Sequence, residues 1–306
     1  MEYVARRLLA TVPVLIGVSI LIFVMLNIIP GDPVTVMMKE RISPDVVEKV
    51  KAQMGLDDPL IVRYFRFIGG ALRGDFGTSY KLNRPVSRLI MQAFPNTLAL
   101  ALAAALVSWL IGIPAGVLSA LKPNTIIDRA FMGFSVAGIS MPIFWSALLM
   151  QYLFALKLGW LPVSGFYGAK YLLMPAVALG WSAAGTIARL SRSSLLDVMQ
   201  KDYIRTARAK GLSEVQVVVC HALKNALLPV VTVMAIQVAS FLSGAVITES
   251  VFGIPGLGRL AVDAIRTRDM PLLEGSVLFA TFLVVMGNAM ADILYSTLDP
   301  RIRYGR

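Results

Sequence analysis

Six uncharged stretches, each 17 to 27 residues long, constrain this chain more than any other feature. An α-helix rises about 1.5 Å per residue, so about 20 apolar residues cross the hydrocarbon core of a membrane. Hydrophobic residues make up 57% of the chain and charged residues 15%, too few for a water-soluble fold to cover its surface with polar groups. The sequence therefore predicts an all-α polytopic membrane protein with six transmembrane helices, at residues 8–29, 97–121, 130–156, 171–188, 226–248 and 275–291.

The first stretch has one property of a secretory signal peptide, because Arg6 and Arg7 precede it. It is too long for the apolar region of a signal peptide, which has roughly 7–15 residues. It is also followed by Pro30-Gly31-Asp32-Pro33 and not by small residues typical of a cleavage site. We interpret residues 1–29 as a retained N-terminal transmembrane helix.

Lysine and arginine are distributed unevenly over the connections between the six stretches. With the N-terminus inside, the inner connections and the C-terminal tail, residues 299–306, carry 14 basic residues and the short outer loops carry five. Cytoplasmic loops are enriched in basic residues, so both termini are predicted to be cytoplasmic. Attraction to anionic lipid headgroups then accounts for most of the net charge of +11, and nucleic acid is not needed as a partner.

The outer segment, residues 30–95, has the sequence pattern of a small helical unit. Proline at a first helical position predicts helices that begin at Pro44, Pro59 and Pro85, the first ending before Gly55. Such a unit fits either a cap that packs on the spans or a docking surface and vestibule wall. The two interpretations are compatible.

The inner segment, residues 189–224, predicts two helices separated by a glycine. The first helix is expected to end at Lys210, with Gly211 in a left-handed conformation. Ser213 and Gln216 have the spacing of a capping box, which predicts that a second helix begins at once. The first helix also carries a basic stripe at helical spacing, formed by Lys201, Arg205 and Arg208.

Residues 202–212 (DYIRTARAKGL) and 221–229 (HALKNALLP) closely resemble the dipeptide/oligopeptide/nickel family of ABC-importer permeases. The resemblance covers the whole chain and is greatest to the first of the two permease subunits. Further motifs in the family's order are PGDP at 30–33, GDFG at 74–77, VF at 251–252, PGLGR at 255–259 and DPR at 299–301.

The resemblance implies that the inner segment is the EAA loop, which fits a cleft on an ATPase subunit. Its implied coupling residues are Arg205, Thr206, Ala207, Arg208, Lys210, Gly211, Leu212 and Ser213. Arg205 stands where the general motif has glutamate, and Lys224 stands where it has proline. A carboxylate contact at position 205 is therefore not expected.

The resemblance also implies the partners and the location of the chain. They are a second homologous permease, two ATPase subunits that hold ATP and magnesium, and an extracytoplasmic solute-binding protein, in a bacterial or archaeal cytoplasmic (inner) membrane. No cofactor is expected on this chain, which has no G-x-x-x-x-G-K-[ST] phosphate-binding motif. Di- and oligopeptides are the family's commonest solutes; glutathione, nickel and sugar derivatives are the alternatives.

A few residues near the ends of the spans are candidates for the solute pathway or for a surface that faces the binding protein. Ionisable groups at membrane depth are costly and often functional, although such groups also pair structurally. The candidates are Glu249 and Asp292, with Pro255, Gly256, Gly258 and Arg259 of the family's outward-facing hairpin. Cys220 and His221 are neighbours on a helix and point in different directions, so we expect neither a catalytic dyad nor a metal site.

The sequence predicts four segments: a helix at residues 1–29, an extracytoplasmic segment at 30–95, a transmembrane domain at 96–298 with the coupling loop at 189–224, and a tail at 299–306. The alternative function is a secondary transporter or channel that works alone. Such a protein has ion-coupling groups at mid-membrane and can have an inverted repeat. The spans carry no central charge and no repeat is evident. An intramembrane enzyme is a third alternative, but the chain lacks the nucleophile–base pair that such an enzyme needs.

Overall fold

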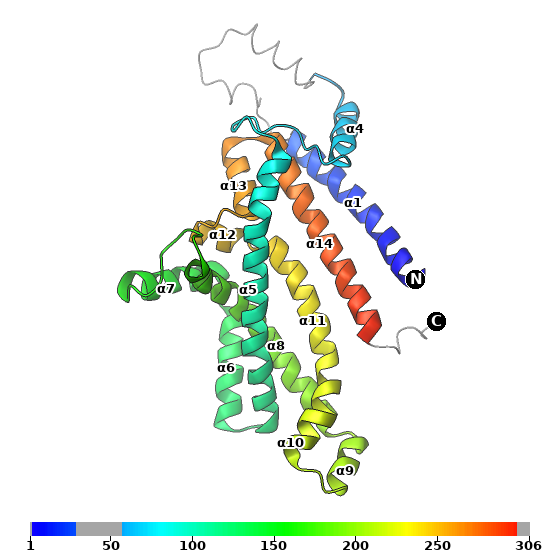
Figure 1. The fold of residues 1–306 in the computed structure, drawn as a ribbon, viewed down its shortest axis with the longest axis vertical. Coiled ribbons are helices and arrows are strands. Elements are labelled where there is room, and N and C mark those ends of the chain that lie inside the picture. The colour runs from blue at the N-terminus through cyan, green and yellow to red at the C-terminus, as the bar shows by residue number, and fades with distance from the viewer. Residues whose placement is uncertain (1, 29–56, 299–306) are drawn as a thin grey trace. The chain divides into compact units, whose positions relative to one another are not determined.

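The structure is a computed structural model that describes residues 2–28 and 57–298, and its regular elements in these ranges are all helical. The all-α prediction is therefore confirmed for the described residues (Figure 1). The elements, with η marking π-helices, are α1 (Glu2–Ile28), α4 (Leu60–Ala71), α5 (Val86–Leu121), α6 (Ile126–Ser140), α7 (Ile143–Met150), η1 (Gln151–Lys157), α8 (Ala169–Met199), α9 (Asp202–Ala209), α10 (Glu214–Gln216), η2 (Val217–Ala222), α11 (Leu223–Gly244), α12 (Val246–Phe252), α13 (Leu257–Thr267) and α14 (Met270–Leu298).

Four of the predicted spans correspond to helices that are long and apolar enough to cross a membrane. The first predicted span lies on α1, whose described apolar part runs from Leu9 to Met25. The four spanning helices are Val86–Leu121, Ala169–Met199, Glu214–Leu242 and Met270–Ile293, counted over the described residues.

The third predicted span is not the single helix expected at 130–156. The chain forms α6 and then a second helical segment, Ile143–Lys157, at an angle of 107° to it. The break falls at Met141, which is extended with φ −79° and ψ 129°, directly before Pro142. Proline has no N–H to donate and disfavours the helical conformation of the residue before it, which explains the bend. If α6 and Ile143–Lys157 are taken together as one bent span, they make a fifth candidate span in the described residues.

The helices of the outer segment begin close to where proline predicts them. α4 follows Pro59, and the next helix begins at Val86, directly after Pro85. That helix is not separate from the second span, because α5 continues without a break through Pro95. The predicted helix between Pro44 and Gly55 lies outside the described residues, as do the PGDP motif and the C-terminal tail, 299–306.

The structure groups the described residues into two compact units. The first comprises the described parts of Met1–Thr97 together with Pro255–Val285, and the second comprises Leu98–Ile254 and the described residues from Met286 onward. The return of residues 255–285 to the N-terminal unit is not anticipated by a division of the chain at residues 95 and 96.

In the first unit, Asp269 joins the loop between α4 and α5 to the start of α14. Its buried carboxylate accepts hydrogen bonds from the hydroxyl of Ser79 at 2.5 Å and from the backbone N–H groups of Tyr80 at 3.1 Å and Lys81 at 3.2 Å. Burial, and secondly the charge of Glu274, raises the pKa of Tyr80 to about 12, so this phenol stays neutral at physiological pH. The three hydrogen bonds to Asp269 hold residues 79–81 of this loop against the start of α14.

In the second unit, glycines allow α5, α6 and α8 to pack closely. A Cβ atom added to Gly116 of α5 would lie 2.4 Å from the carbonyl oxygen of Ala188, and one added to Gly185 of α8 would lie 2.4 Å from that of Ser135. Small residues are typical of such helix contacts in membranes. The three helices therefore form a tightly packed group, and the chain continues from α8 into a helical hairpin.

Candidate coupling site

A helical hairpin follows α8 and leads into α11, as Figure 1 shows for α9 and α10. α9 ends at Ala209, one residue before the predicted end, and Gly211 has a φ of +82°. The N–H of Gly211 donates to the carbonyl oxygen of Arg208 at 2.9 Å. Residues with a side chain rarely adopt this φ, so the prediction of a left-handed glycine at the turn is confirmed.

The second helix of the hairpin begins with the predicted capping box. The hydroxyl of Ser213 accepts a hydrogen bond from the N–H of Gln216 at 3.4 Å. The side-chain oxygen of Gln216 accepts one from the N–H of Ser213 at 3.2 Å. These bonds satisfy backbone donors that would otherwise lack partners at the helix start. Local hydrogen bonds therefore fix the turn on both sides, at the end of α9 and at the start of α10.

A π-helical turn, η2, follows α10 directly and was not predicted from the sequence. π-helical turns are rare in proteins overall, and those that occur are often found at functional sites. The segment Glu214–Ala222 contains neither glycine nor proline, so no local signal marks the change of helix type. Cys220 is exposed on η2, and the described residues contain no group of three or more metal-ligating side chains.

One face of α9 is fastened to the end of the membrane helices. Ile204 and Ala207 are buried and share an apolar cluster with Leu195 of α8 and with Val217 and Ala222 of η2. Because α9 is short, these buried contacts and not its intrinsic propensity hold it in place. This cluster also includes Ala226, so α9 is packed against α8, η2 and the start of α11.

The opposite face of the hairpin is exposed. Among the predicted coupling residues, Arg205, Thr206, Arg208, Lys210, Gly211 and Ser213 are exposed, whereas Ala207 is buried and Leu212 half-buried. The last two residues support the hairpin from inside. Three exposed apolar side chains were missed by the sequence analysis: Tyr203, Val215 and Val219. Val215 and Val219 are four residues apart, a spacing that identifies an apolar helix face.

The basic stripe on α9 is partly paired with acidic residues. Arg208 forms two hydrogen bonds to Glu214 across the glycine turn, Nε to Oε1 at 2.7 Å and Nη2 to Oε2 at 3.3 Å. This hydrogen-bonded contact raises the pKa of Arg208 above its ordinary value. Arg205 lies 3.7 Å from Asp202, and both side chains are largely exposed. The pair Arg208–Glu214 therefore joins the two arms of the hairpin.

Reversing the charge at position 208 is expected to weaken coupling. In Arg208→Glu, two carboxylates face each other across the turn, and we expect stimulation of ATP hydrolysis by loaded binding protein to fall roughly two- to fivefold, since exposed pairs are weak. Arg208→Glu combined with Glu214→Arg restores the pairing and is expected to recover most of the stimulation. Failure of the double variant to recover any stimulation contradicts a positioning role for this pair.

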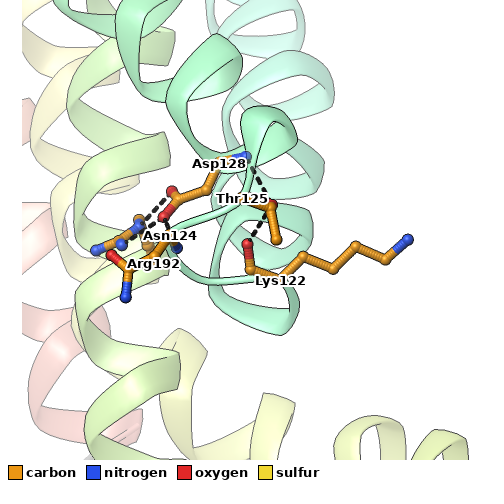
Figure 2. A network of polar contacts seen from close by, with 5 residues as sticks. All are labelled: Lys122, Asn124, Thr125, Asp128 and Arg192. Carbon is orange, nitrogen blue, oxygen red and sulfur yellow. Dashed lines mark hydrogen bonds and ion pairs between the residues drawn. The ribbon is translucent and has the colours of Figure 1, made fainter.

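An ion pair between α6 and α8 was also missed by the sequence analysis (Figure 2). Asp128 accepts two hydrogen bonds from Arg192 of α8, from Nε at 2.8 Å and Nη2 at 2.7 Å. Its Oδ2 also accepts the backbone N–H of Asn124 at 2.9 Å, and its own N–H donates to the N-cap hydroxyl of Thr125 at 3.4 Å. The start of α6 is thereby tied to α8.

Arg192 lies on α8, the helix that leads into the hairpin. α8 continues from Arg192 to Met199, and α9 begins three residues later. The Asp128 side chain is 6% exposed and that of Arg192 is 26% exposed, so water screens the contact weakly. The ion pair therefore links α6 to the helix that leads into the hairpin.

The other candidate residues have varied environments. Glu249 is fully buried in α12 within the second unit, and Asp292 of α14 is half-buried. In the first unit the carbonyl of Pro255 accepts a hydrogen bond from Asn96 at 2.8 Å, and Gly256 is the N-cap of α13. Two further candidates, Gly258 and Arg259, lie on α13, where Arg259 is 3.8 Å from Asp263.

Comparison with protein families and with individual proteins shows which proteins this chain resembles. Residues 112–304 match the model of the "Binding-protein-dependent transport system inner membrane component" family, and residues 1–101 match the model of its N-terminal region. The chain is 41% identical to the di/tripeptide transport system permease protein DppB of Pseudomonas aeruginosa (strain UCBPP-PA14), with 100% of both chains covered. It is 42% identical to the oligopeptide transport system permease protein AppB of Bacillus subtilis (strain 168) and 40% identical to the glutathione transport system permease protein GsiC of Salmonella paratyphi A (strain ATCC 9150 / SARB42), with 99% of each chain covered.

Solved structures share the fold. An inward-facing structure of the MetNI methionine ABC transporter superposes with a TM-score of 0.59 at 22% identity, and covers 69% of this chain and 96% of that one. An amino acid ABC transporter superposes with a TM-score of 0.54 at 18% identity, and covers 70% of this chain and 94% of that one. With two family models spanning almost all of its length, the chain belongs to the family of inner-membrane components of binding-protein-dependent transport systems.

Proposed function

We propose that this chain is the first permease subunit of an ATP-driven peptide importer, in which it pairs with a second homologous permease. Two ATPase subunits act on the cytoplasmic side, and an extracytoplasmic binding protein delivers the solute. The observation that carries the proposal is the hairpin of α9 and α10, which is fastened by Ile204 and Ala207 and presents Arg205 and Lys210 outward. Attraction to lipid headgroups requires only basic residues near the membrane surface. A rigid, structured surface of this kind fits the docking of a partner protein.

In the proposed mechanism, this chain performs no covalent chemistry and binds no cofactor. Magnesium and ATP belong to the ATPase subunits, which have their own phosphate-binding motifs. Closure of the ATPases displaces the hairpin, and α8 and α11 carry the displacement into the membrane. Transport by alternating access requires that ATP and solute favour different conformations, because a ligand with equal affinity for both shifts nothing.

Short peptides are the proposed solute class. The names of the relatives cited above refer to di- and tripeptides, oligopeptides and glutathione, which all contain peptide bonds. The similarity to these relatives extends over the full length of the chain. It therefore supports a solute class shared with them and not only a shared fold. Nickel chelates and sugar derivatives remain the competing solutes in an uptake assay.

Reconstitution tests the assignment of partners. We expect ATP-driven, binding-protein-dependent uptake of a labelled di- or tripeptide in proteoliposomes only when this chain, the second permease and the ATPases are all present. Omission of any one of them is expected to reduce uptake to background. Uptake by this chain alone, without ATP, would overturn the proposal and favour a secondary transporter or channel.

The proposed topology places both termini and residues 189–224 in the cytoplasm and residues 30–95 outside. Cys220 is the only cysteine, so Thr78→Cys and Lys122→Cys are introduced singly into a Cys220→Ser chain; both positions are exposed. An impermeant thiol reagent is expected to label position 78 in intact spheroplasts and position 122 only after permeabilisation. Labelling of both positions from the same side contradicts the proposed orientation.

A further inference from the structure

A groove of about 560 Å³ runs along the surface of α6 and α8, within the second unit. Seven residues line it, and they divide into an apolar part and a polar part. They are Met132 and Ile139 of α6, and Thr186, Arg189, Leu190, Arg192 and Ser193 of α8. Of these seven residues, only Arg192 belongs to the ion pair with Asp128.

The polar part of the groove is dominated by Arg189, which is exposed. None of the ion pairs found among residues 2–28 and 57–298 involves Arg189. The neighbouring guanidinium, Arg192, already gives Nε and Nη2 to Asp128. Two exposed residues, Thr186 and Ser193, complete the polar lining, and the hydroxyl of Ser193 donates to the carbonyl oxygen of Leu190 at 3.1 Å. The groove therefore offers one uncompensated positive charge, together with hydroxyl groups.

The apolar part extends from this charge along α6. Met132 and Ile139 are seven residues apart, about 10 Å along one face of a helix. Arg189 directly follows the uncharged stretch 171–188, so it stands where the apolar span ends. The groove thus combines a cationic end at the level of lipid headgroups with an apolar wall on the hydrocarbon side.

We propose that this groove binds an anionic glycerophospholipid. The phosphate lies against Arg189 and the hydroxyl of Thr186, and an acyl chain packs along Met132 and Ile139. Basic pockets between transmembrane helices are suited to anionic headgroups, because a cation attracts the net negative charge that a zwitterionic lipid lacks. The bound lipid would cover the side of α6 and α8 next to the Asp128–Arg192 ion pair.

Native mass spectrometry of the intact transporter tests this site. The transporter is taken from nanodiscs of phosphatidylcholine containing phosphatidylglycerol, and retained phosphatidylglycerol is counted. Arg189→Gln is expected to weaken retention about fivefold, the effect of one basic side chain near an anionic surface. Arg129→Gln is the matched control, since Arg129 is an exposed arginine near the start of α6 that lies outside the groove. Arg189→Lys is expected to keep most of the retention.

Equal losses in Arg189→Gln and Arg129→Gln contradict the proposal, since they indicate general surface attraction. Unchanged retention in Arg189→Gln also overturns it. A photo-crosslinking amino acid at Ile139 provides an independent readout, with an adduct to phosphatidylglycerol expected. A crosslink to the second permease instead would identify the groove as a protein interface. Lipid retention is counted without any transport, so its failure is distinct from failure of the proposed importer function.

Discussion

Gly211→Val is expected to remove most of the stimulation of ATP hydrolysis by loaded binding protein, while the chain still inserts into the membrane. Gly211 has a φ of +82°, and a Cβ atom there would meet nothing within 4 Å. The strain therefore comes from the backbone conformation and not from a clash. A left-handed conformation costs an ordinary residue about 1–2 kcal/mol, which lowers the population of the correctly turned hairpin roughly 5- to 30-fold. ATPase activity of the reconstituted transporter, with and without loaded binding protein, measures the loss.

Two control variants separate the turn from other effects of substitution. Gly211→Asn keeps a residue that tolerates positive φ and is expected to retain most of the stimulation. Gly133→Val places the same side chain on α6, where no atom lies within 4 Å and the glycine has no positive φ, and it is expected to behave as the unsubstituted chain. Normal stimulation and uptake in Gly211→Val would show that this turn does not couple the two processes.

Asp128→Asn is expected to destabilise the second unit by about 3 kcal/mol, the lower end of the range for breaking a buried ion pair. The lower end applies because the Arg192 side chain keeps 26% of its surface exposed. Asparagine can accept one of the two hydrogen bonds from Arg192, but its NH₂ group faces the other donor. The variant leaves a cation uncompensated between α6 and α8. The temperature at which the chain aggregates in the detergent-solubilised transporter, followed by a fluorescent tag on this chain, measures the effect.

A second substitution on the same helix provides the control for this prediction. Asp197→Asn removes an exposed carboxylate of α8 and is expected to leave the aggregation temperature unchanged. The double variant Asp128→Asn with Arg192→Gln removes both charges and is expected to be more stable than Asp128→Asn alone. Equal aggregation temperatures for Asp128→Asn and Asp197→Asn would show that the ion pair contributes little.

Features that depend on neighbouring residues could be predicted from the chain alone. The spans follow from uncharged stretches because a bilayer requires about 20 consecutive apolar residues. The hairpin turn follows from Gly211, Ser213 and Gln216, which interact within a few positions of one another. The break in the third span at Met141, directly before Pro142, was not predicted, and neither was the angle of 107° between its two helical segments.

Features that join distant positions required the folded chain. Asp128 and Arg192 are 64 residues apart, and Ser79 and Asp269 are 190 residues apart, so neither pair has a local pattern. The inward position of Ala207 and the full burial of Glu249 likewise depend on which helices pack against them. In a membrane protein most side chains of a span are apolar whether they face lipid or protein, so hydrophobicity locates a helix without showing its buried face. Packing in three dimensions supplies that information, and with it the ion pair and the groove between α6 and α8.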